Sequence, residues 1–216
     1  FGPMLAPHPY DKPVRDFEGD RLRLSAPTQQ NPFGTDRTGY DVFSRVLYGA
    51  REIMVIPGIA TALSVAFGAA LGMALGYFGG WFDEIVSRAL DSLLSIPAMV
   101  LALVMLGTIG PSPVGIVIVV VLLYTPIVTR VIRSATLGLR SAGFVEAAKL
   151  RGDSTLYILS REILPSVLPA LIVEAALRFS YAIFLTASLG FLGLGVQPPS
   201  PDWGRMVNEA RGDAGI

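Results

Sequence analysis

Long stretches without a charged residue alternate with short polar segments along this chain. No Asp, Glu, Lys or Arg occurs from Ile53 to Phe82 or from Ser92 to Thr129. A helix that crosses a bilayer needs roughly 20 apolar residues, so the first stretch can hold one membrane span. The second can hold two, because the glycine and proline residues of 107–113 favour a tight reversal in its middle. A further apolar stretch follows, from Ile163 to Val196.

This pattern predicts an all-α integral membrane protein. Strands of a membrane barrel would be about ten residues long and would alternate in polarity, and these stretches do neither. We expect a transmembrane domain over residues 51–196, in which Pro97 kinks the second span. The expected spans are residues 53–77, 84–106, 114–132 and 166–195.

The polar segments predict the orientation. Basic residues outnumber acidic ones over residues 130–162, and cytoplasmic loops carry an excess of Lys and Arg. We therefore expect a cytoplasmic loop over residues 133–165. Residues 1–50 and 197–216 are then extracytoplasmic. Apolar residues at helical spacing over Asp41–Tyr48 favour a short amphipathic helix at the membrane interface, and a plain loop helix is the alternative.

Glycine recurs every fourth residue in the first expected span. In a helix such residues lie on one face, where the missing side chains let a second helix approach closely. We expect this face to form a tight seam, although glycine is also simply common in membrane helices. The residues are Gly68, Gly72, Gly76 and Gly80.

Composition excludes several classes of function. Charged residues make up 16% of the chain and balance, with 17 basic and 17 acidic side chains, so nucleic acid is not an implied partner. The chain has no cysteine and a single histidine, His8, so the sequence predicts no metal site. No Gly-x-x-x-x-Gly-Lys-Ser/Thr phosphate loop occurs. We expect a protein that is not an enzyme and binds no cofactor.

The expected cytoplasmic loop carries ordered helix signals. Phe144–Leu150 favours a helix, with Glu146 near its positive N-terminal end. Gly152 suits a residue of positive φ that closes this helix. A second amphipathic piece is expected over Thr155–Arg161, and Pro165 suits the start of the next span. The pattern predicts a helix–turn–helix, with a solvated loop as the alternative.

These residues also resemble a known motif, the EAA motif of ABC-importer permeases. The resemblance is carried by Glu146, Ala147, Ala148, Gly152, Ile163, Leu164 and Pro165. In addition, Asn31–Arg51 resembles the N-terminal signature of the C-type subunit of dipeptide, oligopeptide and nickel permeases. Phe191–Gly204 resembles an external loop of the same subfamily.

The resemblance implies a type I ABC importer permease fold, which has six spans. Four would lie in this chain, one before Phe1 and one after Ile216. It further implies half of a translocation pathway in a bacterial or archaeal plasma membrane. The implied partners are a second, B-type permease, two ATP-binding subunits that hydrolyse ATP, and an extracytoplasmic solute-binding protein. The EAA residues would be the coupling helix that docks on an ATP-binding subunit. Di- or oligopeptides are the expected cargo, with nickel complexes or a related solute as alternatives.

Three ionisable residues within the apolar stretches need a separate interpretation. Glu174 and Arg178 are placed to pair along one helix, and Asp91 lies near Arg88. Ionisable residues at such depth face a cavity or the bundle interior, so these residues either line the translocation path or form structural pairs. An ion-coupled secondary transporter that uses Asp91, Glu174 and Arg178 is the competing hypothesis.

Overall fold

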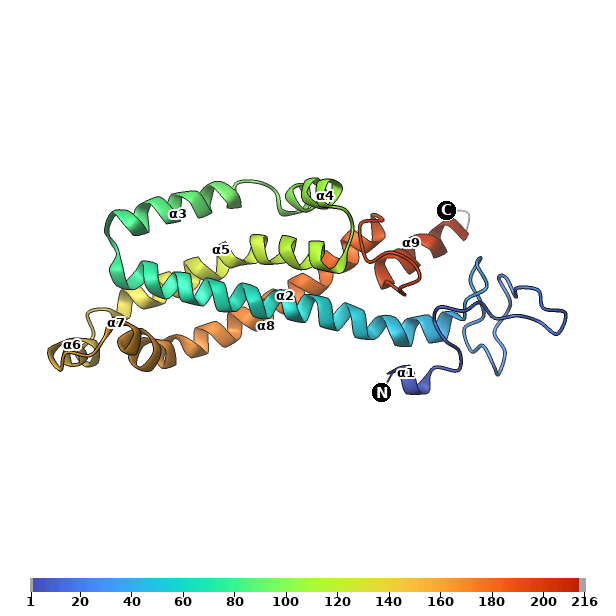
Figure 1. The fold of residues 1–216 in the computed structure, drawn as a ribbon, viewed down its shortest axis with the longest axis horizontal. Helices are drawn as coiled ribbons and strands as arrows, with labels where there is room; N and C mark the ends of the chain where they lie inside the picture. Colours follow the sequence, from blue (N-terminus) through green and yellow to red (C-terminus); the bar gives the residue numbers. More distant parts are fainter. Residues whose placement is uncertain (1, 214–216) are drawn as a thin grey trace. The chain divides into compact units, whose positions relative to one another are not determined.

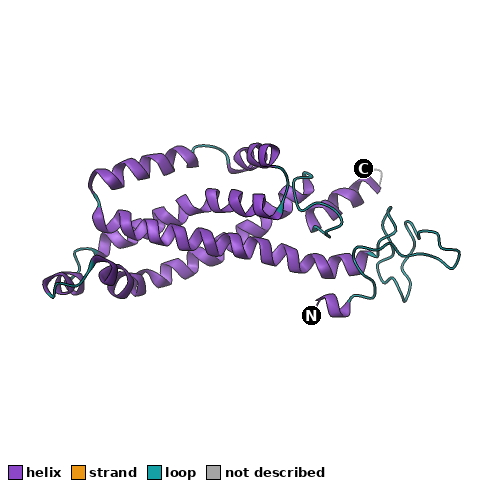
Figure 2. Ribbon diagram, in the orientation of Figure 1, coloured by secondary structure: helices purple, strands orange, loops and turns teal. Residues whose placement is uncertain are grey.

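The computed structural model describes residues 2–213, which form helices joined by loops (Figures 1 and 2). Within those residues the only β pairing is two isolated bridges, Arg15–Arg21 and Thr35–Asp41. The chain packs as two compact units. The first comprises the residues up to Pro57, Met105–Ile116, and the residues from Ile183 onward, and the second comprises Gly58–Val104 and Val117–Ala182. The all-α fold class is confirmed.

The helices follow the apolar pattern closely. Three of them are long and apolar enough to cross a membrane: Val42–Phe78, Pro113–Leu139 and the run Thr155–Phe191. The elements are α1 (Gly2–Leu5), α2 (Val42–Phe78), α3 (Gly80–Leu94), α4 (Ala98–Ile109), α5 (Pro113–Leu139), α6 (Gly143–Leu150), α7 (Thr155–Tyr157), the π-helix η1 (Ile158–Ile163), α8 (Leu164–Phe191) and α9 (Trp203–Asp213).

Helix α2 begins earlier than expected, because the short helix over Asp41–Tyr48 and the first span are one continuous helix. Asp41 accepts a hydrogen bond from the Ser44 backbone N–H at 2.8 Å, as an N-cap residue does. Arg45 is almost fully buried but lies within ion-pair distance of Asp36 and of Glu209, the latter at 3.3 Å. Its charge is thereby satisfied, so the polar residues of this segment do not end the helix.

The expected second span is divided into two helices. Helices α3 and α4 are bent by 85° at the break between them. We expected Pro97 to kink one helix over 84–106, and instead it directly precedes the first residue of α4. Proline has no backbone N–H and biases the preceding Ile96 toward extended backbone. The break is therefore sharper than the kink that we expected.

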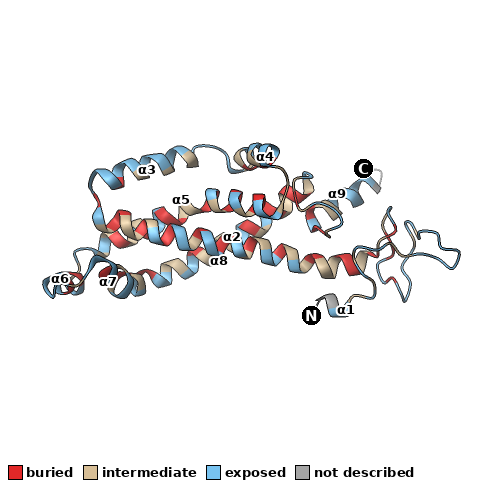
Figure 3. Cartoon of the chain, viewed as in Figure 1, coloured by how far each residue is buried: buried red, intermediate tan, exposed pale blue. Residues whose placement is uncertain are grey.

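In the second unit, helices α2 and α5 contribute most of the buried apolar surface. Figure 3 shows buried residues in red along both helices. Val119, Val120 and Val128 of α5 are completely buried, as is Leu75 of α2. Within a membrane these side chains stabilise the helix pair by van der Waals packing, because lipid tails are as apolar as valine. This pair of helices is the scaffold from which the polar loop after α5 extends.

In the first unit, the two segments that resemble subfamily signatures pack against each other. The Trp203 indole N–H donates to the backbone carbonyl of Val46 at 3.1 Å. A Cβ atom at Gly49 would lie 2.3 Å from the carbonyl oxygen of Pro201, so only glycine fits there. Asp202 is buried and accepts a hydrogen bond from the Arg205 backbone N–H at 2.8 Å. The loop before α9 is therefore fastened to the first turns of α2.

Candidate functional site

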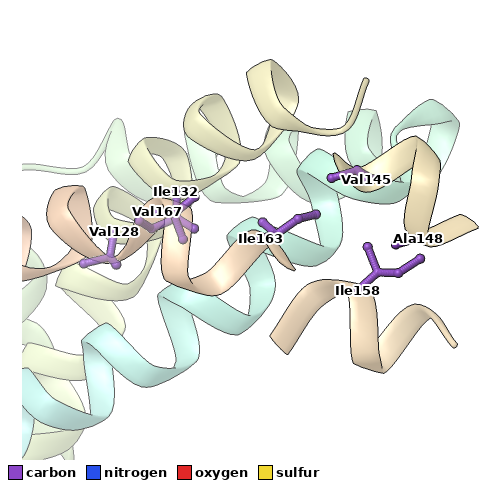
Figure 4. Close-up of a cluster of buried hydrophobic side chains, with 7 residues drawn as sticks. All are labelled: Val128, Ile132, Val145, Ala148, Ile158, Ile163 and Val167. Atoms are coloured by element: carbon purple, nitrogen blue, oxygen red, sulfur yellow. The ribbon is translucent and has the colours of Figure 1, made fainter. Parts of the chain in front are cut away.

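The polar loop after α5 is built on the buried face of α6. Val145 and Ala148 lie one turn apart and are completely buried. Figure 4 shows both side chains on the helix that faces η1, which contributes Ile158 and Ile163 to the same apolar cluster. Burial of Val145 and Ile158 contributes about 1.5–3 kcal/mol each. Helix α6 is therefore anchored to the transmembrane helices by packing and is not a solvated loop.

The opposite face of α6 is open. Phe144, Glu146 and Ala147 are exposed, and Leu150 is 90% exposed. Glu146 lies in the first turn of the helix, where the helix dipole stabilises a carboxylate. It takes part in none of the ion pairs found within residues 2–213. An anchored helix thus presents an acidic and apolar surface outward.

Gly152 ends α6 as expected. Its φ is +80°, in the left-handed region that glycine adopts without strain. The Gly152 N–H donates to the Lys149 carbonyl at 3.0 Å, and the Asp153 N–H donates to the Ala148 carbonyl at 3.1 Å. This pair of hydrogen bonds is a Schellman motif. It satisfies carbonyls that would otherwise lack a donor at the helix end.

Arg151 links this turn to η1. Its guanidinium donates to Asp153 at 2.7 Å and to Glu162 at 3.1 Å. The hydrogen bond to Asp153, opposed by some desolvation, raises the pKa of Arg151. Each contact is exposed and individually weak, but together they fix the turn after α6 against the following helix.

The second half of the loop differs from the expected helix–turn–helix. Ser154 caps α7, since its hydroxyl accepts from the Tyr157 N–H at 3.3 Å. Helix α7 then continues through η1 into α8, so Thr155–Phe191 is one helical run. Pro165 lies two residues after η1 and inside that run. A π-helical segment often accommodates the carbonyl that a proline leaves without a donor. Of the remaining motif residues, Ile163 is buried and Leu164 is half-buried.

Three of the four glycines expected in the seam lie against α5. A Cβ at Gly68 would lie 2.6 Å from the Cβ of Val128, and one at Gly72 would lie 2.7 Å from the Thr129 carbonyl oxygen. At Gly76 a Cβ would lie 2.6 Å from that of Thr136. A Cβ at Gly80 would meet no atom within 4 Å, and Gly80, with a φ of +66°, is the first residue of α3. It is therefore not part of this close approach. We call Gly68, Gly72 and Gly76 the glycine seam.

Glu174 and Arg178 form a buried ion pair along α8. The two groups are 2.8 Å apart, and their side chains are 9% and 13% exposed. The guanidinium also lies over the rings of Tyr124 and Tyr181, 5.7 Å and 5.1 Å from their centres, where a cation is attracted to the ring face. Within this chain the pair therefore lies in a packed interior.

Asp91 has a different partner from the one suggested by its position. It pairs with Arg130 of α5, whereas Arg88 pairs with Glu84 at 2.6 Å. Asp91 and the Glu174–Arg178 pair thus have separate partners, and the described contacts do not join them into one relay. A second bridge between α3 and α5 was not expected from the sequence. It joins Asp83 to Arg133, with one contact of 2.6 Å.

Within the described residues, no group of three His, Asp or Glu side chains is placed to hold a metal ion.

Comparison with known proteins identifies the family. Residues 68–214 match the family described as "Binding-protein-dependent transport system inner membrane component". This chain belongs to that family. The permease is 40% identical to the dipeptide transport system permease protein DppC of Alkalihalophilus pseudofirmus, over 98% of this chain and 68% of that protein. It is 42% identical to the glutathione transport system permease protein GsiD of Shigella flexneri, over 95% of this chain and 67% of that protein.

These relatives confirm the resemblance, and the chain is an ABC permease of the dipeptide/oligopeptide type. A solved structure supports the fold alone. The permease is similar to a chain of the inward-facing MetNI methionine ABC transporter, with a TM-score of 0.60 and 21% identity. The match covers 68% of this chain and 74% of the other. The permease therefore has the type I importer fold that we expected.

Proposed function

We propose that this permease forms half of the translocation pathway of an ATP-driven importer of small peptides in the inner membrane. The relatives with which it shares about two fifths of its residues are a dipeptide and a glutathione permease. Glutathione and dipeptides share peptide bonds and terminal charges. A peptide of two or three residues is therefore the substrate class that the comparison supports best.

The observation that carries the coupling role is the two-sided construction of α6. Val145 and Ala148 fix one face to the transmembrane helices, while Glu146 and Leu150 remain outside. Leu150 is 90% exposed, so a partner that covers it would be bound more tightly. We propose that an ATP-binding subunit covers this face and moves it, and that the anchored face transmits the movement to α5 and α8. ATP hydrolysis would then occur entirely in the partners.

The segments expected outside the membrane and those expected in the cytoplasm fall in different units. The first unit contains residues 1–57 and the residues from 183 onward, which include both segments expected outside the membrane. The second contains the connection before α3 and the loop 133–165, both expected in the cytoplasm. In the proposed assembly, a solute-binding protein binds on the extracytoplasmic side of the membrane. A second permease and two ATP-binding subunits complete it.

The coupling role is testable in the reconstituted complex. Glu146→Ala and Leu150→Ser each remove an exposed group without touching the buried face. We expect binding-protein-stimulated ATP hydrolysis to fall about tenfold, which corresponds to the loss of ~1.4 kcal/mol of docking free energy. Glu18→Ala is the matched control, because Glu18 is also exposed but lies in the first unit.

The measurement compares stimulated ATP hydrolysis, peptide uptake into vesicles and the amount of ATP-binding subunit that co-purifies. Unchanged stimulation in both variants would refute the coupling role of α6. Normal coupling with no uptake of dipeptides, tripeptides or glutathione would instead refute only the proposed substrate class.

A further inference from the structure

An apolar groove of about 490 Å³ opens on the second unit. Helices α2, α3 and α5, which Figure 1 labels, all contribute to it. Several of its side chains are well exposed, and Phe67 is 57% exposed. The groove therefore presents a recess that an apolar molecule can fill. Its walls include Leu63, Phe67, Leu90, Val121, Leu122 and Pro126.

The groove is long enough to hold much of an acyl chain. Along α5 it extends from Val117 to Pro126, which is about 14 Å at the rise of an α-helix.

A polar recess of about 160 Å³ adjoins one end of the groove. The two recesses share Leu90 and Pro126 as lining residues. The polar recess adds Asp91 and Arg130, whose side chains are 58% and 60% exposed. A long apolar recess that ends at exposed charges is complementary to a molecule with an acyl chain and a charged head.

The charges of the polar recess select the kind of headgroup. Arg130 is paired with Asp91, and Arg133 donates to Asp83 at 2.6 Å. The recess itself is lined by Asp91, Arg130 and Arg133, and Asp83 lies outside it but pairs with Arg133. With both ion pairs counted, the formal charges around the recess cancel, so the recess does not favour an anionic headgroup. A zwitterionic headgroup fits better, with its phosphate on Arg130 and its ammonium on Asp91. A primary ammonium can donate hydrogen bonds to the carboxylate, whereas a quaternary ammonium cannot.

We propose that this recess is a binding site for a phospholipid whose headgroup combines a phosphate with a primary ammonium, as in phosphatidylethanolamine. The headgroup exchanges partners with the exposed Asp91–Arg130 pair, and one acyl chain occupies the groove beside Phe67 and Leu122. In the proposed orientation of the permease, Arg130 lies toward the cytoplasm. The headgroup therefore lies at the cytoplasmic end of the groove, between α3 and α5.

Native mass spectrometry of the assembled transporter, purified from its membrane, tests the site. Leu122→Trp fills the groove and Arg130→Gln removes the phosphate contact. We expect Arg130→Gln to lower the retained phosphatidylethanolamine about fivefold, the effect of losing one charge contact at a membrane surface. Leu122→Trp should also lower it, because the new side chain occupies the space of the acyl chain. Asp91→Asn should shift the retained lipid from phosphatidylethanolamine to phosphatidylglycerol, because it removes the ammonium partner and leaves Arg130 in place.

Two control variants separate this site from lipids that coat any apolar surface. Val173→Trp alters an exposed position on α8, and Arg88→Gln breaks an exposed ion pair on α3. Both should retain lipid as the wild type does. Equal retention in Leu122→Trp and the wild type would overturn the proposal. Release of the second permease by Leu122→Trp would also overturn it, since a protein helix would then fill the groove. Lipid retention requires no ATP hydrolysis, so the result is independent of the coupling role of α6.

Discussion

The glycine seam and the α6 turn use the same residue type for opposite reasons. Gly68, Gly72 and Gly76 are needed because α5 lies where a side chain would be, and at each of them a Cβ would lie within 3 Å of another atom. A Cβ at Gly152 would have no atom within 4 Å, but the residue has a φ of +80°. One set of glycines allows two helices to touch, and the other allows the backbone to turn.

The acidic residues of the two regions also differ in burial and pairing. Glu174 is buried and paired with Arg178, whereas Glu146 is exposed and takes part in no ion pair within residues 2–213. The buried charge of Glu174 is therefore paired within the transmembrane helices. The loop after α5 leaves its outer face for a partner. Substitutions in the transmembrane helices should accordingly lower the stability of the permease, whereas substitutions on the outer face of α6 should lower ATP hydrolysis.

The largest effect on stability is expected in the transmembrane helices. Glu174→Ala leaves the Arg178 guanidinium buried without a counter-charge, and breaking a buried ion pair in this way costs about 3–5 kcal/mol. We expect that loss in the free energy of unfolding of the permease in mixed micelles. The double variant Glu174→Ala/Arg178→Met should recover most of it, because it removes both charges.

A Glu174→Ala variant as stable as the wild type would contradict the structural interpretation of this pair. Normal stability combined with lost peptide uptake would instead place the pair on the translocation path.

The glycine seam should give the next largest effect. Gly72→Val introduces a Cβ that lies 2.7 Å from the Thr129 carbonyl oxygen, and overpacking of this kind costs about 1–3 kcal/mol. Gly138→Ala is the matched control on α5, since nothing lies within 4 Å of a Cβ there. The free energy of unfolding of that control should rise by ~0.5–1 kcal/mol, because alanine is more stable than glycine in a helix. Equal melting temperatures for both variants in detergent would show that the seam is not in close contact.

Gly152→Val should have the smallest effect on overall stability. A non-glycine residue in the left-handed region costs about 1–2 kcal/mol, and here the strain falls on the loop. We expect faster hydrogen exchange at the amides of Gly152 and Asp153, with little change in the unfolding of α2 and α5. Gly152→Asn should exchange more slowly than Gly152→Val, because asparagine tolerates this conformation better. Identical exchange in the two variants would argue against backbone strain as the cause.

Local signals explain which parts of this structure were predictable from the sequence. The helix over α6 and the positive φ of Gly152 follow from propensity and capping within a few residues. The spacing of Gly68, Gly72 and Gly76 likewise defines one face of a helix. Gly80 continues that spacing but lies beyond the last residue of α2, where periodicity no longer indicates a shared face.

Features that depend on a distant partner could not be predicted in this way. The pairing of Asp91 with Arg130 joins residues of α3 and α5, and no local pattern selects it over the nearer Arg88. The 85° angle between α3 and α4 was also not predictable, because a proline indicates a break in a helix but not its angle. The continuity of α2 through Arg45 depends on Asp36, in the loop before the helix, and on Glu209, which lies far away in the sequence.

The π-helix η1 puts one extra residue into the helical run from α7 to α8. Its hydrogen bonds close from residue i to residue i+5, so a turn of η1 holds more residues than a turn of the α-helices on either side. Deleting one residue within η1 should therefore restore a regular α-helix and keep Ile158 and Val167 on the faces that they occupy. An insertion would instead rotate them apart by about 100°.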